Sequence, residues 1–327
     1  MSREITVINM CNGGKVPPSG RRDSIASLLK GLARHTANDL VSAYFSAAMP
    51  QFPLAIEIET INRCNNNCSF CPVNANEDPR SYELMDLSLV ERIATELGAA
   101  NYRGLLALFS NNEPLLDARI ADICAIFRNR LKAAHIYMYT NGIMLTPPLY
   151  LSLFNAGLDE LIIDNYSEKG ELILPVKTLI NEINRLGEAV EPYKARTRVF
   201  IRRKKEVLTN RGGSAPNKKG KEDNEFLGLR NASCVLPFIQ MVVRPTGEVS
   251  LCCQDALGRV TIGDVSREGI HAVWNNATMK DIRTRLKMFG RSSVELCRGC
   301  DASIIYSAVL KRKIYGMAHL PTGNFRL

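Results

Sequence analysis

The stretch LAIEIETINRCNNNCSFC, residues 54–71, joins an apolar, strand-like run to three closely spaced cysteines. Cys64, Cys68 and Cys71 have CxxxCxxC spacing. Three thiolates can hold three irons of a cubane 4Fe-4S cluster, and the fourth iron is then left for a non-protein ligand. A zinc knuckle is the alternative, but zinc sites favour two CxxC-like pairs over an asymmetric triplet. The spacing therefore favours a catalytic cluster over a structural one.

Short apolar runs alternate with amphipathic stretches after residue 54, and this alternation predicts a parallel sheet with crossover helices. Ligands of such sheets bind beyond the carboxyl ends of the strands, and the cysteine triplet directly follows the first strand. Ser88 and Glu91 predict a capping box for the first helix, and Gly98 predicts its end. We expect strands at 54–60, 104–109, 135–140, 159–164 and 197–201, and helices at 88–98, 117–131, 147–156 and 175–190.

The composition predicts a globular chain with one sizeable domain and a small appended one. The chain has 327 residues, of which 46% are hydrophobic and 23% are charged. No apolar stretch approaches the length of a membrane span, and the N-terminus lacks a signal-peptide pattern, so a cytoplasmic protein is expected. Ten Cys in such a chain indicate reduced thiols for metal binding and not a disulfide framework.

Three segments are predicted from changes in pattern along the chain. Residues 1–52 form a helical extension whose helix starts at Asp23 or Ser24, and residues 53–222 form the alternating α/β domain. Residues 223–327 form a smaller region. Its expected elements are a hairpin around the turn 245–247, a helix at 270–288 and a terminal helix at 302–315.

The segment 202–221 carries eight Lys or Arg residues against one Glu. A solvated loop is the simplest interpretation. An anionic substrate, an acidic electron-donor protein and nucleic acid are the functional alternatives. Nucleic acid is disfavoured, because the run has no aromatic residue on which bases could stack.

A second group of cysteines falls in the smaller region, with a true CxxC pair at 297–300. Four thiols would saturate a second metal site, and spacing alone allows either zinc or an iron-sulfur cluster. The members of this group are Cys234, Cys252, Cys253, Cys297 and Cys300.

Both cysteine groups carry a family resemblance. CxxxCxxC after a first strand resembles the radical S-adenosylmethionine (SAM) enzymes. The order SC-VLP, LCC and LCRGC resembles their half-size SPASM domain, called twitch, which holds an auxiliary 4Fe-4S cluster. With the NRGG segment at 210–213, the chain is similar over residues 54–302 to radical SAM dehydrogenases of antibiotic biosynthesis. The resemblance implies an α/β fold, an open, partial TIM-type barrel followed by a small α+β domain.

The resemblance also implies roles for individual residues. It assigns the SAM-bound cluster to Cys64, Cys68 and Cys71, and an auxiliary cluster to Cys234, Cys252, Cys297 and Cys300, with Cys253 left over as a small buried hydrophobe. SAM contacts are implied for Asn112, Glu113, Thr140, Asn141 and Gly142, although Asn111 and Asn112 stand where glycines are common. Arg211 would anchor a substrate oxygen, because a guanidinium is an unlikely base.

The implied reaction is the two-electron oxidation of a secondary alcohol to a ketone on a sugar-like, aminocyclitol or nucleoside-like substrate. SAM bound to the open iron yields a 5′-deoxyadenosyl radical, which abstracts a hydrogen atom, and the auxiliary cluster takes the second electron. Reduced flavodoxin or ferredoxin is the implied electron donor. Epimerisation, dehydration, decarboxylation and peptide modification remain alternatives, as does a zinc-binding adaptor that is no enzyme.

Overall fold

The computed structural model describes residues 4–11, 40, 43–44, 47, 49–76, 78–218 and 233–302. Residues 40, 43–44 and 47 are helical, and the rest of the expected N-terminal helix lies outside the described residues. The expected boundary near residue 223 also lies outside them, as does the terminal helix beyond residue 302.

A nine-stranded sheet forms the frame of the molecule, in the order β1-β6-β5-β4-β3-β2-β7-β8-β9. All pairs from β1 to β7 are parallel, and β7, β8 and β9 are antiparallel. Because β1 and β9 are edges, the barrel is open, as expected. The strands are Thr6–Asn9 (β1), Ala55–Ile58 (β2), Leu105–Ala107 (β3), His135–Thr140 (β4), Glu160–Ser167 (β5), Thr197–Arg203 (β6), Gln240–Val243 (β7), Glu248–Ser250 (β8) and Thr261–Asp264 (β9).

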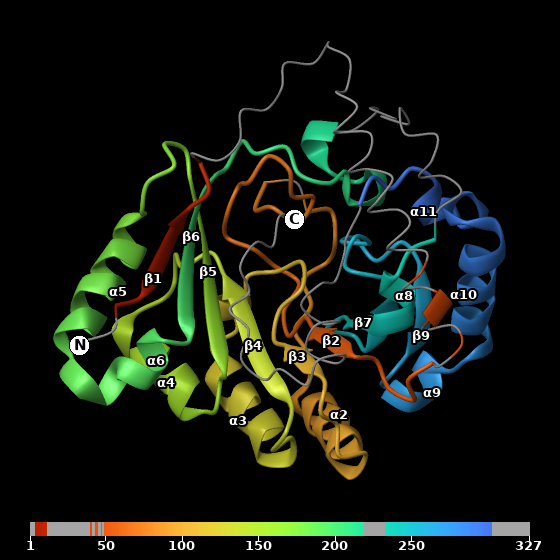
Figure 1. The fold of residues 1–327 in the computed structure, drawn as a ribbon, viewed down its shortest axis with the longest axis horizontal. Coiled ribbons are helices and arrows are strands. Elements are labelled where there is room, and N and C mark those ends of the chain that lie inside the picture. Colours follow the sequence, from red (N-terminus) through yellow and green to blue (C-terminus); the bar gives the residue numbers. More distant parts are fainter. Residues whose placement is uncertain are drawn as a thin grey trace.

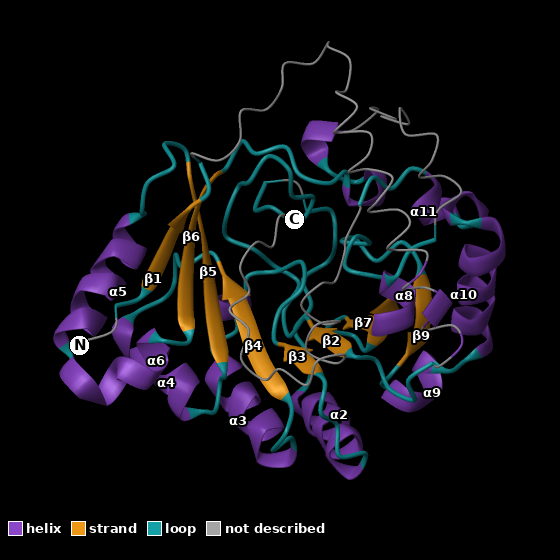
Figure 2. Ribbon diagram, in the orientation of Figure 1, coloured by secondary structure: helices purple, strands orange, loops and turns teal. Residues whose placement is uncertain are grey.

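Helices cover the outer side of the curved parallel sheet, and the loops at the carboxyl ends of the strands gather inside the curve (Figures 1 and 2). The alternation along β4 explains this, since Ile136 and Met138 are fully buried while Tyr137 and Tyr139 on the opposite face are partly open. The outer helices are Leu87–Ala99 (α2), Ile120–Arg130 (α3), Pro147–Asn155 (α4), Leu174–Arg185 (α5) and Glu191–Lys194 (α6), with 3₁₀ turns at Pro114–Leu116 (η1) and Gly187–Val190 (η2).

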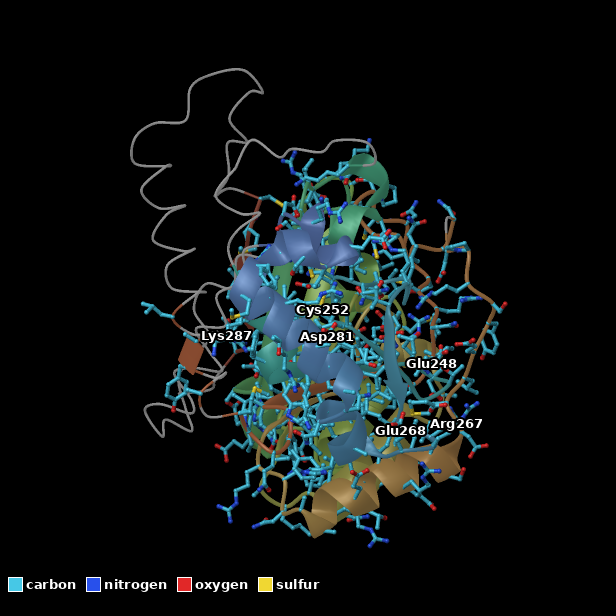
Figure 3. The ribbon with its side chains drawn as sticks, turned by 90° about the vertical axis from the view of Figure 1, so that its right-hand side faces the viewer. Glu248, Cys252, Arg267, Glu268, Asp281 and Lys287 are labelled. Carbon is cyan, nitrogen blue, oxygen red and sulfur yellow. The ribbon has the colours of Figure 1, made fainter. Side chains whose placement is uncertain are left out.

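The C-terminal region continues the same sheet. Strand β7 pairs in parallel with β2, with Glu57 opposite Val242, so the two cysteine-bearing regions share one framework. From the side, α10 lies in front of Cys252, and charged side chains such as Asp281 and Lys287 are exposed on the outside (Figure 3). The helices here are Leu236–Ile239 (α8), Ile270–Trp274 (α9), Ala277–Phe289 (α10) and Glu295–Arg298 (α11), with 3₁₀ turns at Arg211–Gly213 (η3), Pro216–Lys218 (η4) and Arg291–Ser293 (η5).

Several local predictions were wrong. Asp86, and not Ser88, caps α2, because its carboxylate accepts the Ser88 N–H at 2.7 Å, and the helix runs one residue past Gly98. The single helix expected at 270–288 is two helices. Asn276 caps the second by accepting the Met279 N–H at 2.8 Å. The N-terminal segment also contributes an edge strand, β1, that the sequence analysis did not expect.

No helix within the described residues is long and apolar enough to cross a membrane.

Candidate functional site

The CxxxCxxC loop after β2 is shaped by hydrogen bonds within it. The Cys71 N–H donates to the Cys68 carbonyl at 3.2 Å, and the Asn66 N–H donates to Cys64 Sγ at 3.4 Å. The Ser69 N–H donates to the Lys204 carbonyl at 3.0 Å, which ties the loop to the segment after β6. Burial raises the pKa of all three thiols, that of Cys64 to about 12. Burial disfavours the free thiolates, so a bound metal cluster would be needed to stabilise these cysteines in the thiolate form.

Cations next to the loop offset this cost. Burial is the main influence on the Cys71 thiol, but Arg211 and then Arg80 lower its pKa. Lys204 does the same for Cys68. The Arg80 guanidinium lies 2.9 Å from an Asp78 carboxylate oxygen and 3.5 Å from one of Glu59, so its position is fixed. The surroundings therefore favour a bound anionic cluster.

Glu113 links the loops that follow β2, β3 and β4. Its side chain is 1% exposed. The carboxylate accepts hydrogen bonds from Leu115 N–H at 3.2 Å, Thr140 Oγ1 at 2.6 Å and Asn141 N–H at 2.7 Å. Its own N–H donates to the Arg63 carbonyl at 2.8 Å. Burial, against these hydrogen bonds, raises the pKa of Glu113 to about 7.

The remaining residues predicted to contact SAM gather around this junction. Asn141 Nδ2 donates to Asn65 Oδ1 at 2.8 Å and lies 3.9 Å from Cys64 Sγ. Asn112 Nδ2 is buried and has no hydrogen-bond partner among the described residues, so it is a donor left for a ligand. Asn111 and Asn112 both keep negative φ angles, so this loop does not need glycine there.

Gly142 closes the turn after β4 and requires glycine. Its φ is +77°, and its N–H donates to Thr140 Oγ1 at 3.1 Å. A Cβ at this position would lie 2.5 Å from Val176 Cγ2 and 2.9 Å from Ile163 Cγ2. The turn therefore packs against the outer helical layer while its other side meets the cysteine loop.

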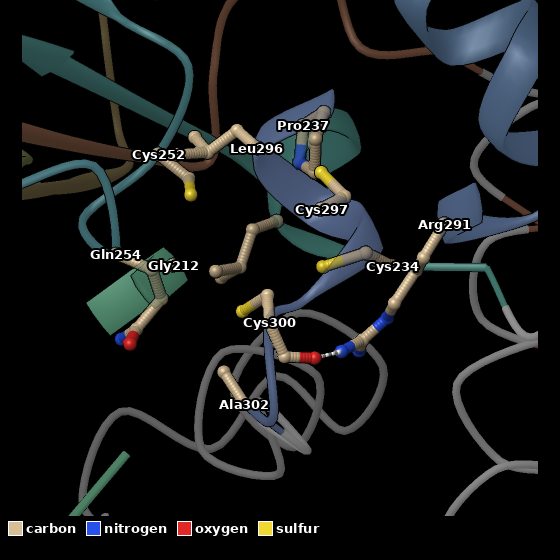
Figure 4. Close-up of a pocket in the computed structure, with 11 residues that line it drawn as sticks. Gly212, Cys234, Pro237, Cys252, Gln254, Arg291, Leu296, Cys297, Cys300 and Ala302 are labelled. Carbon is tan, nitrogen blue, oxygen red and sulfur yellow. Dashed lines mark hydrogen bonds between the residues drawn. The ribbon is translucent and has the colours of Figure 1, made fainter. Parts of the chain in front are cut away.

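Four cysteines of the second group line one pocket (Figure 4). They come from four places in the chain: Cys234 precedes α8, Cys252 follows β8, Cys297 lies in α11 and Cys300 follows it. Across the described ranges, no three His, Cys, Asp or Glu side chains converge on a single ion position. A cubane cluster needs no such convergence, since each thiolate binds a different iron.

Cys253 is not part of this lining. Its carbonyl accepts a hydrogen bond from Asn111 Nδ2 at 3.0 Å, and Gln254 Nε2 donates to its Sγ at 3.8 Å. Burial raises the pKa of its thiol to about 12. Four of the five cysteines of the second group thus line the pocket, and Cys253 does not.

Arg291 lies among the four pocket cysteines and was not predicted from the sequence. Its side chain is 2% exposed and donates to the Ser233 carbonyl at 3.4 Å and the Cys300 carbonyl at 3.3 Å. In the described part of the chain, no carboxylate forms an ion pair with it. Burial lowers the pKa of Arg291, but the four thiols together raise it above its usual value. No pattern in the sequence separates this arginine from the chain's other basic residues.

Arg211 lies between the two cysteine groups. Its guanidinium lowers the pKa of Cys71 on one side and of Cys253 on the other. Nη1 donates to Asn111 Oδ1 at 3.4 Å, whereas Nε is buried without a partner among the described residues. Its φ of +51° is unusual for a residue with a side chain. The neighbouring Gly212 lines the second pocket.

The described part of the basic segment, residues 202–218, is only partly the solvated loop that was expected. Arg202 is 7% exposed and lies 3.8 Å from Asp164 and 3.3 Å from Glu206. Lys218 lies 2.6 Å from Asp301. Two of these carboxylates, Asp164 and Asp301, lie far from the segment in the sequence, so a count of charges along one run cannot foresee their pairs.

The inner face of the sheet supplies further polar groups between the two cysteine groups. Glu57 on β2 is 6% exposed. Burial raises the pKa of Tyr137 and Tyr139 on β4, and the nearby charge of Glu57 raises it further. Phe109 packs against Tyr139, with ring centroids 4.7 Å apart. A signal for Glu57 was present, because carboxylates at 57 and 59 alternate with Ile56 and Ile58 in a buried run.

Two family models match the chain, one over each cysteine group. The model described as the radical SAM superfamily matches residues 58–165, and the iron-sulfur cluster-binding domain called SPASM matches residues 234–301. The chain is 24% identical over 246 residues to the S-adenosyl-L-methionine-dependent 2-deoxy-scyllo-inosamine dehydrogenase of Niallia circulans, covering 75% of this chain and 92% of the relative.

The chain is also similar to a second relative and to a solved structure. A 7,8-dihydro-6-hydroxymethylpterin dimethyltransferase of Methanocaldococcus jannaschii is 30% identical over 134 residues, covering 38% of this chain and 26% of the relative. A crystal structure of BtrN in complex with AdoMet and 2-DOIA matches the fold with a TM-score of 0.62 at 24% identity, covering 76% of this chain and 92% of BtrN. The chain therefore combines a radical SAM domain with a SPASM domain, as an enzyme that uses SAM and a 4Fe-4S cluster and has a SPASM domain for additional iron-sulfur binding.

Proposed function

We propose that this enzyme oxidises a secondary alcohol of a sugar-like, aminocyclitol or nucleoside-like substrate to a ketone. The observation that carries the proposal is the four-cysteine pocket, with Arg211 lying between it and the cysteine triplet. Oxidation must remove two electrons, and a second cluster next to the substrate provides an acceptor for the second one. The dehydrogenase activity named for the Niallia circulans relative supports the same reaction.

The proposed ligands of the two clusters follow from the donor sets. Three thiolates from the triplet and four from the pocket suit 4Fe-4S clusters. Buried donors on Asn112 and Arg211 have no partner within the described ranges and are available to SAM and substrate. With both cofactors bound, the first site supplies a 5′-deoxyadenosyl radical that takes a hydrogen atom, and the second supplies the electron acceptor. The proposed ligands are Cys64, Cys68 and Cys71 for the first cluster and Cys234, Cys252, Cys297 and Cys300 for the second.

The chain's own residues position the reactants in this proposal. Glu113, held by Thr140 and Asn141, presents a carboxylate oxygen with spare acceptor capacity to the SAM amino group. The Arg211 Nε–H, which has no partner among the described residues, donates to the substrate oxygen. Gly142 lets the turn that carries Asn141 come close to the cysteine loop.

The electron donor is proposed to be an acidic protein, such as a reduced flavodoxin or ferredoxin. The formal net charge of +9 supports this proposal. In the described part of segment 202–221, Arg202 and Lys218 pair with buried or half-buried carboxylates, whereas Lys205, 3.7 Å from Glu168, keeps 83% of its side chain exposed. An anionic substrate gains less support, because Arg202 and Lys218 are already paired with carboxylates.

The test is an anaerobic screen of alcohols with the reconstituted full chain and dithionite. The panel starts with 2-deoxy-scyllo-inosamine, and the readouts are 5′-deoxyadenosine, product mass and deuterium transfer from a labelled carbinol carbon. Oxidation lowers the substrate mass by two hydrogens, whereas epimerisation leaves it unchanged and dehydration removes water. A product of unchanged mass, or one that has lost water, would refute the proposal. Replacement of Arg211 by Ala is expected to spare both clusters and to reduce turnover.

A further inference from the structure

Glu57 is a buried carboxylate whose hydrogen-bond partners, among the residues that the structure describes, are both neutral. Its Oε2 accepts a hydrogen bond from Ser110 Oγ at 2.5 Å, and Oε1 accepts one from Gln240 Nε2. No Lys or Arg of the described residues forms an ion pair with it. A charge buried in this way is costly, so the group gains from taking up a proton or from a ligand that brings one.

The surroundings of Glu57 bring its pKa close to neutral pH. Burial is the main reason that its pKa rises to about 7, and the nearby Glu59 raises it further. The Ser110 hydrogen bond and, more weakly, Arg211 lower it. The titratable or charged groups facing Glu57 are Glu59 just after the same strand, Tyr137 and Tyr139 on β4, Cys253 after β8, and Arg211 on η3.

A chain of hydrogen bonds connects Glu57 to Arg211. Ser110 Oγ donates to Glu57 and accepts from Asn111 Nδ2 at 3.3 Å, and Asn111 Oδ1 accepts from Arg211 Nη1 at 3.4 Å. Asn111 is itself held at both ends, since its N–H donates to Glu59 at 2.7 Å and its side chain to the Cys253 carbonyl. The carboxylate and the guanidinium are thus fixed relative to one another.

This network lies where the proposed reaction takes place. Arg211 influences Cys71 of the triplet, and Cys253 adjoins Cys252 of the second pocket. Each Glu57 oxygen has one hydrogen bond and keeps a further lone pair, while Arg211 keeps an unpartnered Nε–H. The network therefore offers a substrate hydroxyl an acceptor on Glu57 and a donor on Arg211.

We propose that Glu57 is the catalytic base that accepts the hydroxyl proton of the substrate while Arg211 holds the same oxygen. This inference rests on the proposed function. Conversion of R₂CHOH to R₂C=O removes one carbon-bound hydrogen atom, one electron and one proton. The hydrogen atom goes to the 5′-deoxyadenosyl radical, the electron to the iron-sulfur acceptor and the proton to the Glu57 carboxylate. Arg211 does not take the proton, because a guanidinium stays protonated.

The test compares the wild-type holoenzyme with Glu57→Gln and Glu57→Asp, using an alcohol from the panel that the wild type oxidises. The readouts are ketone formed per 5′-deoxyadenosine, the separate kcat and KM values, and their dependence on pH. The wild-type rate of ketone formation should rise with pH through about 7, because only the carboxylate form accepts a proton. Glu57→Gln should lower kcat by roughly 100-fold and remove this pH dependence, while iron content and 5′-deoxyadenosine formation persist. Glu57→Asp should keep the pH dependence.

Ser110→Ala provides a second test that leaves the carboxylate in place. Because the Ser110 hydrogen bond lowers the pKa of Glu57, its loss should move the midpoint of the pH profile upward. An unchanged midpoint overturns the inference, as does a Glu57→Gln enzyme that forms as much ketone per 5′-deoxyadenosine as the wild type. A change in KM alone also overturns it, because Glu57 would then only bind a cationic group of the substrate. If Glu57→Gln loses its clusters, the Ser110→Ala midpoint decides. A wild type that forms no ketone overturns both this inference and the proposed function.

Discussion

The two cysteine groups share one sheet but differ in what surrounds their thiols. Around the triplet, the neighbours are amides and paired charges, including Asn141, Glu113 and the Arg80 guanidinium with its two carboxylates. Around the four-cysteine pocket, apolar side chains from Leu236, Pro237 and Leu296 dominate. The pocket contains one buried cation, Arg291.

This difference suits two kinds of chemistry. A site that must bind and release SAM needs hydrogen-bond donors that no other residue uses, and Asn112 Nδ2 is such a donor. A site that only stores and passes an electron needs its irons saturated by the protein and shielded from water. The first group thus fits an exchangeable ligand and the second a closed electron acceptor.

The largest expected effect separates the two groups by their metal content. Replacing Cys64, Cys68 and Cys71 together by Ala should abolish SAM cleavage, while about four irons per chain remain at the other site. Iron and sulfide analysis after anaerobic reconstitution, with 5′-deoxyadenosine measured by chromatography, checks this. Retained cleavage would contradict the assignment, and zinc without iron or sulfide in the wild type would refute both clusters.

The next effect concerns the pocket, with a matched control in the adjacent thiol. Replacing Cys252 by Ala should destabilise the second cluster and reduce ketone formation, while some 5′-deoxyadenosine is still made. Cys253→Ala should leave the iron content unchanged, since this thiol lies outside the pocket lining. Equal iron loss in both variants would mean that the division between the two cysteines is wrong.

The sequence predicted the elements of the parallel sheet well, because alternation between buried runs and amphipathic stretches follows directly from the two-sided burial of such strands. The strand expected at 135–140 coincides with β4. Ends were harder to predict. Asp86 caps α2 and the last long helix breaks at Asn276, where short polar side chains compete for the same backbone groups.

The site residues likewise divide into those that a sequence pattern predicts and those that depend on tertiary packing. Cysteine spacing is a local property, so it identified the triplet and the CxxC pair at 297–300, whereas the family resemblance was needed to set Cys234 and Cys252 with that pair and to leave Cys253 out. Glu57 and Arg291 depend on which distant segments pack against them, and β7 beside β2 brings Gln240 to Glu57. The ion pairs of the basic segment were not predicted for the same reason, since Asp164 and Asp301 lie far from it in sequence.

A smaller effect is expected for Arg291, as a change in the reduction potential of the second cluster. At a separation of about 7 Å and an effective dielectric constant of about 20, removing the charge is worth roughly 0.1 V. Arg291→Gln should therefore lower the potential of that cluster, while Arg291→Lys, which keeps the charge, should lower it less. Redox titration followed by electron paramagnetic resonance in the triplet-free variant measures this cluster alone. An unchanged potential at full iron content would show that the guanidinium has only a structural role.

The smallest effect compares the backbone beside the two sites through a pair of glycines. Gly142 and Gly212 both have positive φ, so Ala strains the backbone at each. At Gly142 the new Cβ would lie 2.5 Å from Val176 Cγ2, against a closely packed helix, whereas at Gly212 it would lie 3.0 Å from the flexible end of Leu296. Gly142→Ala should therefore destabilise the holoenzyme by about 1–3 kcal/mol more than Gly212→Ala, as the difference between their melting temperatures would show. Equal melting temperatures would mean that the structure around Gly142 accommodates a Cβ as readily as the structure around Gly212.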